Sequence, residues 1–258
     1  EVTGKYRITA VNSINWARLM AQVVYYFAAA LQLGAPQRKV AFSVPTGNFG
    51  DVFAGSVAAQ MGLPVERLIV ATNVNDILHR ALSSGDYSAG TVTPTAAPSM
   101  DIQVSSNFER LLYCEGGRDG AALAAQMRGF EASKAMQLTN SQREGASALF
   151  TSARADAAEM TQAIAWASDK CGEVIDPHTA IGLHAARQAD VARDVPIVTL
   201  ATAHPAKFRD AVERATGVRP ALPRRVGDLF DRTEKYEQLP GTYDAVRDYV
   251  EANATQSA

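Results

Sequence analysis

The chain of 258 residues has 47% hydrophobic and 20% charged residues, a composition that excludes disordered, collagenous and disulfide-built proteins. Its formal net charge is -2 and it carries no basic stripe, so nucleic acid is excluded as a partner. The two cysteines, Cys114 and Cys171, have no metal-ligand spacing. Neither a disulfide framework nor a metal site is therefore expected, and a reducing cytoplasm is favoured.

The first residues of the sequence do not have the pattern of a signal peptide, and one apolar run further on is a candidate membrane span. Residues 1–6 lack the basic and apolar regions of a signal peptide. The apolar run 14–33 has the length of a membrane span, about 20 residues. Because Arg18 and Gln22 lie one helical turn apart within this run, we interpret it as a helix buried between layers, and no membrane is expected as a partner.

Short β-branched runs alternate with helix-length segments, which predicts an α/β fold of three αβα layers with a mostly parallel sheet. A strand at 7–11 comes first, and Asn12 or Ser13 is expected to cap the long helix that follows and ends before Gly34. In chain order we then expect a strand at 39–44, a helix at 50–61, a strand at 68–72 and a helix at 76–82.

The middle of the chain is expected to be a loop with helices, and the strand-and-helix rhythm then resumes. Residues 83–98 are rich in Ser, Gly, Thr and Pro, which predicts a long loop. Helices are predicted at 107–114, 119–134, 179–189, 205–215 and 242–252, with two more in the Ala-rich segment 141–170 and a strand at 196–202. The domains expected are an α/β cofactor-binding domain at 1–82 and 176–217, a loop and helical insertion at 83–175, and an irregular tail with a final helix at 218–258.

The most informative motif is Pro45-Thr46-Gly47-Asn48-Phe49-Gly50-Asp51, a glycine-rich turn between a strand and a helix. Such a turn directs free backbone N–H groups and the positive end of a helix dipole at one place, which favours phosphate. It has neither the G-K-[ST] ending of a P-loop nor a full G-x-G-x-x-G. A small cofactor with a single phosphate therefore fits better than ATP or NAD, and a turn with no ligand is the alternative.

Two further polar clusters follow predicted strands. Asn12, Ser13, Asn15 and Arg18 offer amide, hydroxyl and guanidinium donors, suited to a second phosphate or a carboxylate. The alternative is that Ser13 caps the helix and Arg18 meets solvent.

In Thr199-Leu200-Ala201-Thr202-Ala203-His204-Pro205, Thr202 is a candidate to bind a ligand heteroatom, with a helix cap as the alternative. His178 and His184 are six residues apart on one helix, face different sides and do not form a metal pair.

Several segments resemble threonine synthase, a pyridoxal phosphate enzyme of the tryptophan synthase β-subunit class, and in particular its longer bacterial and fungal branch. They occur in family order across nearly the whole chain. The resemblance rests on the residues at 11–18, 44–51, 98–102, 105 with 107–110, 176–180 and 201–208.

The resemblance implies roles for the candidate residues. The cofactor phosphate would be held by the backbone of Gly47, Asn48, Phe49 and Gly50, and the pyridine nitrogen by Thr202. The phosphate of the substrate, O-phospho-L-homoserine, would be held by Asn12, Ser13, Asn15 and Arg18. The implied reaction converts that substrate and water to L-threonine and phosphate.

The chain departs from the family at one point. The family lysine that binds the cofactor covalently lies in a Ser-Phe-Lys-Asp type motif, and the chain contains no such motif. We therefore predict that the chain resembles the carboxyl-terminal part of the enzyme, has no catalytic residue of its own, is inactive alone, and has the amino-terminal part of the same enzyme as its partner.

Two other functions remain open. One is another lyase of this class, such as a serine or threonine dehydratase or a cysteine synthase, which would not need a cradle for a substrate phosphate. The other is a non-catalytic module that binds a phosphorylated metabolite.

Overall fold

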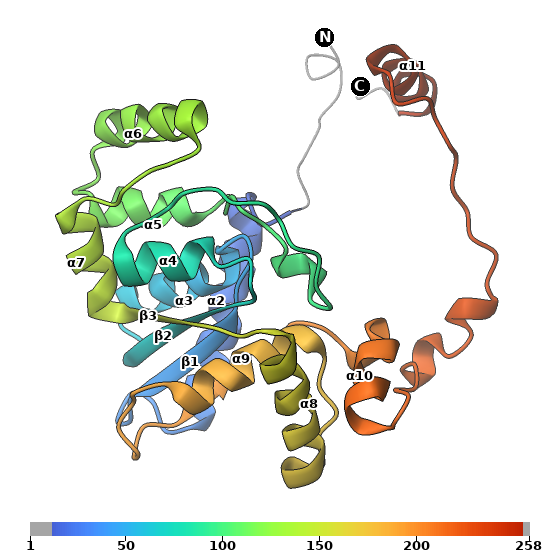
Figure 1. The fold of residues 1–258 in the computed structure, drawn as a ribbon, viewed down its shortest axis with the longest axis horizontal. Helices are drawn as coiled ribbons and strands as arrows, with labels where there is room; N and C mark the ends of the chain where they lie inside the picture. The colour runs from blue at the N-terminus through green and yellow to red at the C-terminus, as the bar shows by residue number, and fades with distance from the viewer. Residues whose placement is uncertain (1–11, 255–258) are drawn as a thin grey trace. The chain divides into compact units, whose positions relative to one another are not determined.

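The computed structural model describes residues 12–254, so the strand expected at 7–11 lies outside the described residues. Residues Asn12–Pro220 form one compact body, and the segment from Ala221 belongs to a separate unit. Figure 1 shows the order of the elements along the chain.

A four-stranded sheet lies at the centre of the body, with the strand order β3-β2-β1-β4 and parallel pairing throughout. The strands are β1 (Val40–Pro45), β2 (Val65–Thr72), β3 (Phe150–Arg154) and β4 (Ile197–Thr199). Phe42 of β1 is in register with Leu68 of β2 and with Val198 of β4. The predicted α/β fold with a mostly parallel sheet is confirmed, and every described pair of strands is parallel.

Helices cover both faces of the sheet and complete three layers (Figure 1). All six residues of β1 are buried, as expected for a parallel strand between two layers of helices. Phe42 faces a core formed with α2 (Trp16–Gln32) and α3 (Gly50–Gln60). Ile69 faces a second core formed with α8 (Ala157–Cys171) and α9 (Pro177–Gln188).

The remaining helices of the body match the predicted positions. They are α4 (Ile77–Ser84), α5 (Phe108–Glu115), α6 (Gly120–Ser133), α7 (Asn140–Leu149) and α10 (Arg209–Thr216). The helix predicted at 205–215 is divided into a 3-10 turn, Pro205–Lys207, and α10. The segment from Ala221 contains 3-10 turns at Arg224–Val226 and Leu229–Asp231, and then α11 (Tyr243–Asn253), which confirms a final helix.

The two helices predicted within 141–170 are confirmed as α7 and α8, but the strand between them was not predicted. Capping boxes at Thr139 and Asp156 start α7 and α8, and β3 occupies the residues between. Phe150 is buried and pairs with Leu68 of β2. The five residues of β3 show too little hydrophobic alternation to predict a strand from the sequence. Pairing with the edge of β2 stabilises the strand instead. The domain boundaries stay a prediction, although β3 places part of 83–175 in the central sheet.

The caps predicted for the first helix, Asn12 or Ser13, were wrong. α2 begins at Trp16, and the side chain of Asn15 accepts a hydrogen bond from the Ala17 N–H at 3.0 Å. Asn12 instead forms a turn in which its side-chain oxygen accepts from the Ile14 N–H at 3.0 Å. This turn moves the helix start beyond Ser13 and leaves the Ser13 hydroxyl free of a capping role.

Candidate functional site

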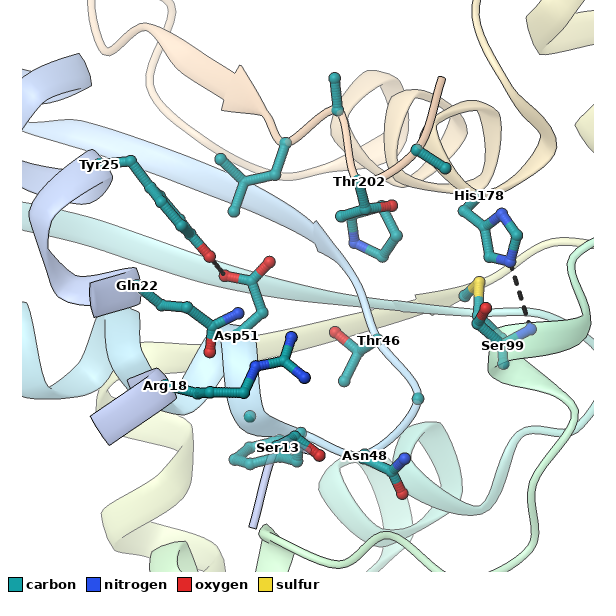
Figure 2. Close-up of a pocket in the computed structure, with 18 of the residues that line it drawn as sticks. Ser13, Arg18, Gln22, Tyr25, Thr46, Asn48, Asp51, Ser99, His178 and Thr202 are labelled. Atoms are coloured by element: carbon teal, nitrogen blue, oxygen red, sulfur yellow. Dashed lines mark hydrogen bonds between the residues drawn. The ribbon is translucent and has the colours of Figure 1, made fainter. Parts of the chain in front are cut away.

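A cavity of about 750 Å³ opens at the carboxyl ends of β1 and β4, where ligands of open α/β sheets bind. Figure 2 shows the polar side chains that face it. Its lining residues come from segments far apart in the sequence: Asn12, Ser13, Arg18, Gln22, Tyr25, Ala29, Pro45, Thr46, Gly47, Asn48, Phe49, Gly50, Asp51, Ser99, Met100, His178, Leu200, Ala201, Thr202, Ala203, Lys207 and Phe208. All the candidate residues except Asn15 are therefore brought together.

The turn after β1 is anchored by hydrogen bonds that its carbonyl oxygens accept. The carbonyl of Gly47 accepts a hydrogen bond from the Ser105 hydroxyl at 2.9 Å. The carbonyl of Asn48 accepts from the backbone N–H of Asn107 at 3.1 Å and from its side-chain amide at 2.9 Å. The C=O and N–H of a trans peptide point in opposite directions. The N–H groups of Asn48 and Phe49 consequently point away from these anchors.

The backbone of the turn has a conformation that few residues adopt. Phe49 has a φ of 62°, in the left-handed region, and its buried ring packs against Phe108 and Phe150 at centroid distances of 5.2 and 5.6 Å. A Cβ atom at Gly47 would collide with the carbonyl oxygen of Ser99. The buried aromatic ring and the absent Cβ together fix the shape of the turn.

The backbone donors of this turn are free. Among residues 12–254, the N–H groups of Gly47, Asn48, Phe49 and Gly50 have no hydrogen-bond partner. They lie at the amino terminus of α3, which has no side-chain cap. Unpaired N–H groups together with the positive end of a helix dipole make a site for a phosphate or another anion.

A second wall of the cavity is one face of α2. Arg18, Gln22, Tyr25 and Ala29 follow at helical spacing and all line the cavity. Within the described part of the chain, the Arg18 guanidinium makes no hydrogen bond or ion pair, so it is available to a ligand (Figure 2). Sequence reasoning noted the polar stripe of Arg18 and Gln22 but assigned a ligand role to Arg18 alone, and it missed Tyr25, although its helical spacing from Arg18 was a signal that could have found it.

Asp51 joins the two walls. Its Oδ1 accepts a hydrogen bond from the Tyr25 hydroxyl at 2.5 Å (Figure 2). It also accepts one from the Tyr26 hydroxyl at 3.0 Å. Burial raises the pKa of Asp51 above its ordinary value, against the lowering effect of these two hydrogen bonds. Burial, followed by the charge of Asp51, also raises the pKa of Tyr25 and of Tyr26. Both tyrosines therefore remain protonated donors.

Thr202 lies on the segment that follows β4, and it is not a helix cap. His204 caps the next 3-10 turn, because its Nδ1 accepts from the Ala206 N–H at 3.1 Å. Among the described residues, no hydrogen bond is made by the Thr202 hydroxyl, and Thr202 lines the cavity (Figure 2). The hydroxyl is thus free to bind a ligand heteroatom.

His178 closes the cavity wall opposite α2. Its Nε2 accepts from the Ser99 N–H at 3.3 Å (Figure 2). Its Nδ1 lies 2.7 Å from Oδ2 of the buried Asp176. This network places the ring proton on Nδ1. Burial raises the pKa of Asp176, but hydrogen bonds from His178 and Thr179 outweigh it and leave the pKa below its ordinary value.

The loop that carries Ser99 is fixed by Asp101. Its Oδ1 accepts from the side-chain amides of Asn73 at 2.7 Å and Asn75 at 3.0 Å, and its Oδ2 accepts from the Thr95 N–H at 2.7 Å. Sequence reasoning assigned no role to these side chains, because they come from different parts of the chain. They hold the Ser99 carbonyl against Gly47.

Comparison with known proteins gives one consistent family. Residues 179–250 match the family model described as "Threonine synthase, C-terminal". The chain is 54% identical over 245 residues to a threonine synthase of Pseudomonas aeruginosa, covering 95% of this chain and 52% of the relative. It is 44% identical over 252 residues to that of Corynebacterium glutamicum, with coverages of 95% and 52%. The chain spans about half the length of the curated relatives it matches.

Solved structures agree with the sequence relatives. The fold superimposes on a pyridoxal phosphate (PLP)-bound threonine synthase from Brucella melitensis with a TM-score of 0.91 and 50% identity, over 95% of this chain and 52% of that one. A threonine synthase from yeast gives a TM-score of 0.88 and 36% identity, over 97% of this chain and 55% of that one.

Proposed function

We propose that this chain, which is a homologue of the threonine synthases, forms the part of such an enzyme that binds the phosphate of PLP and the phosphate of O-phospho-L-homoserine. The complete enzyme would convert this substrate and water to L-threonine and phosphate. The observation that carries the proposal is that one cavity combines a backbone anion site with a separate guanidinium, that of Arg18.

The residues of the cavity suit PLP. The cavity volume lies within the usual range for cofactor sites, roughly 300–1,000 Å³. The free N–H groups of the turn 47–50 would hold the cofactor phosphate, and the Thr202 hydroxyl would face the pyridine nitrogen. When bound, PLP withdraws electrons from the substrate carbon atoms next to it. A neutral hydroxyl at the ring nitrogen, in place of a carboxylate, tempers that withdrawal.

The α2 wall would bind the substrate phosphate. Arg18 would pair with the phosphate and stabilise the charge that it gains as it leaves, with Ser13 and Asn12 as further donors. Asn15 would act through the start of α2, which its side chain caps. Tyr25 and Tyr26 share their protons with Asp51, and this limits the repulsion between its carboxylate and the incoming phosphate.

The chain needs a partner to catalyse the reaction. It has no Ser-Phe-Lys-Asp motif, so the lysine that would bind the cofactor and move protons has to come from the amino-terminal part of the enzyme. Loss of that group leaves two phosphate sites without a base, and the chain alone is inactive.

A joined protein tests the function. In it, the part of the Pseudomonas aeruginosa threonine synthase that this chain does not match is fused to this chain in the natural order. With PLP and O-phospho-L-homoserine we expect the joined protein to release phosphate and form threonine, and the 258-residue chain to release none. Phosphate release by the chain alone contradicts its inactivity, and a folded, PLP-loaded joined protein without threonine formation contradicts the function.

The two alternative functions give different results. Another lyase of this class would act on serine or threonine in the joined protein without needing Arg18. A non-catalytic module would bind O-phospho-L-homoserine with the 258-residue chain alone, and calorimetry would show this binding unchanged when the chain is joined to the other half.

A further inference from the structure

The outer face of α2 is apolar and exposed, although α2 belongs to the core of the body. Leu19, Val23, Tyr26 and Ala30 on its inner face are buried, and Arg18, Gln22 and Tyr25 on a second face line the cavity. The residues on the outer face are all exposed and all apolar: Ala17, Ala21, Val24, Ala28 and Leu31. We call these five residues the outer stripe. A helix that is apolar on its outer face as well as on its core face is normally covered.

The spacing of the outer stripe is that of a helix–helix contact. Its members follow one another at intervals of 4, 3, 4 and 3 residues, which is the heptad pattern of knobs-into-holes packing. Val24 is 65% exposed and Leu31 58% exposed, so the large side chains of the stripe meet solvent. The three alanines of the stripe, Ala17, Ala21 and Ala28, would let a second helix approach closely.

An apolar groove runs beside the outer stripe, between α2 and α3. It has a volume of about 540 Å³ and is lined entirely by apolar residues: Trp16, Leu19, Met20, Val23, Val24, Phe27, Val57 and Met61. Met20 and Met61 are 55% and 65% exposed. Stripe and groove form one apolar surface, and contiguous surfaces of this kind mark interaction sites.

A bilayer is not the partner that α2 fits. Within residues 12–254, no helix is both long enough and apolar enough to cross a membrane. α2 has 17 residues, and Arg18 and Gln22 on its cavity face would lie in the hydrocarbon. We therefore explain the apolar run 14–33 by a helix that packs on the core with one face and on another protein segment with its outer face.

We propose that the outer stripe and its groove dock a helix from the half of the threonine synthase that this chain does not match. The inference rests on the proposed function. The relatives are about twice as long as their match to this chain, which covers 52% of them. The missing lysine must reach the cavity that Arg18 and Tyr25 line, so the other half has to lie next to α2. One helix would then border both the cavity and the interface.

Cysteine labelling of the joined protein tests this interface. Val24→Cys places a thiol of similar size in the middle of the stripe, and Leu31→Cys places one at its end. In the 258-residue chain we expect both thiols to react with a maleimide about as fast as the exposed Cys171. In the joined protein we expect both to react at least about tenfold more slowly, because only local opening then exposes them.

Cys171 serves as the matched control, since its rate should be equal in the two proteins. Peptide mapping by mass spectrometry separates the labelled sites, and Leu31→Cys keeps the test valid if Val24→Cys prevents folding of the joined protein. Equal labelling of the stripe in both proteins, with Cys171 unchanged, overturns the proposal. Protection of the stripe in the isolated chain with a dimer in sedimentation also overturns it, because a second copy is then the occupant.

The test separates the interface from the function. Protected stripe thiols in a joined protein that forms no threonine contradict the proposed function alone. Threonine formation with a fully reactive stripe contradicts the interface alone.

Discussion

The cavity has two walls of different construction. The turn 45–51 offers main-chain N–H groups, and its shape depends on a missing Cβ at Gly47 and on anchors behind it. The α2 wall offers side chains at helical spacing, led by Arg18. A substitution affects the main-chain donors of the turn only if it changes the backbone conformation. A substitution in α2, by contrast, can remove a single donor side chain. Substitutions in the two walls should therefore fail in different ways.

Gly47→Ala should have the largest effect. The added Cβ collides with the Ser99 carbonyl oxygen, so the turn must move. Several N–H donors then no longer point at the phosphate. Each hydrogen bond to a charged group contributes about 1.5–3 kcal/mol, so PLP affinity of the joined protein should fall more than about a hundredfold. Equilibrium dialysis against PLP measures this, and a far-UV spectrum checks that the fold persists.

Gly129→Ala is the matched control for that substitution. Gly129 lies within α6 and a Cβ there meets no atom within 4 Å. PLP affinity should equal that of the wild type, and helix propensity should add up to about 1 kcal/mol of stability. A loss of PLP in both variants would show that the Gly47 effect is not specific to the turn.

Arg18→Ala should act on the substrate and spare the cofactor. Loss of a charge-assisted pair costs about 1.5–3 kcal/mol, which corresponds to a rise in KM for O-phospho-L-homoserine of about tenfold to a hundredfold in the joined protein. PLP affinity should be unchanged. Steady-state kinetics with threonine detection measures KM, and an unchanged KM would favour a lyase that does not need a substrate-phosphate cradle.

Asn107→Ala should affect stability more than binding. The fully buried side chain donates to the Asn48 carbonyl and accepts from Arg110, so its loss removes two hydrogen bonds at a cost of about 1–3 kcal/mol. The backbone N–H of residue 107 still holds the turn, and PLP affinity should fall less than with Gly47→Ala. Urea denaturation of the 258-residue chain measures the loss, and an unchanged midpoint would show that the anchor is dispensable.

Two carboxylates, Asp51 on the turn and Asp176 behind His178, should give the smallest and most diagnostic effects. Asp51 has a raised pKa, so the stability it contributes is present below its ordinary value of 3.8 and declines as pH rises through the folded pKa. Asp176 has a lowered pKa, so its contribution is present above 3.8 and is lost as pH falls through the folded pKa.

Asp51→Asn and Asp176→Asn should therefore change the pH dependence in opposite directions. The free energy of unfolding of the wild type minus that of Asp51→Asn should decrease as pH rises above 3.8. The corresponding difference for Asp176→Asn should decrease as pH falls below 3.8. Urea denaturation of the 258-residue chain between about pH 3 and pH 6 measures both, and slopes of the same sign would contradict the assignment.

The same contrast explains what the sequence could predict. The anion turn was recognisable because its strand, glycines and helix start are consecutive, and local chemistry determines such a unit. Of the second polar cluster, Asn12, Ser13 and Arg18 line the cavity, whereas Asn15 caps α2, and their role toward a ligand stays a prediction. Asn and Ser are both common helix caps, so the sequence cannot show which of the neighbouring residues is the cap. The geometry of the turn before the helix decides it.

The features that the sequence did not reveal depend on contacts between distant segments. β3 became a strand because the edge of β2 was available to it, and the Ser-Ala-Arg residues that end it carry no strand signal. Asp51 is hydrogen-bonded to Tyr25 and Tyr26, which lie 26 and 25 residues before it in the sequence. Ser105 and Asn107 were part of the family resemblance. Their hydrogen bonds to the carbonyl groups of the turn, however, are seen only in the three-dimensional structure.

The central claim is that the backbone of the turn 47–50 binds a phosphate. It is tested most directly by two-dimensional amide NMR of the ¹⁵N-labelled 258-residue chain during titration with PLP, with inorganic phosphate as a second ligand. We predict that the amide signals of Asn48, Phe49 and Gly50 shift with both ligands, that the signal of Gly129 does not, and that Thr202 responds to PLP alone. Saturable binding of PLP with no change at the amides of the turn would contradict the account.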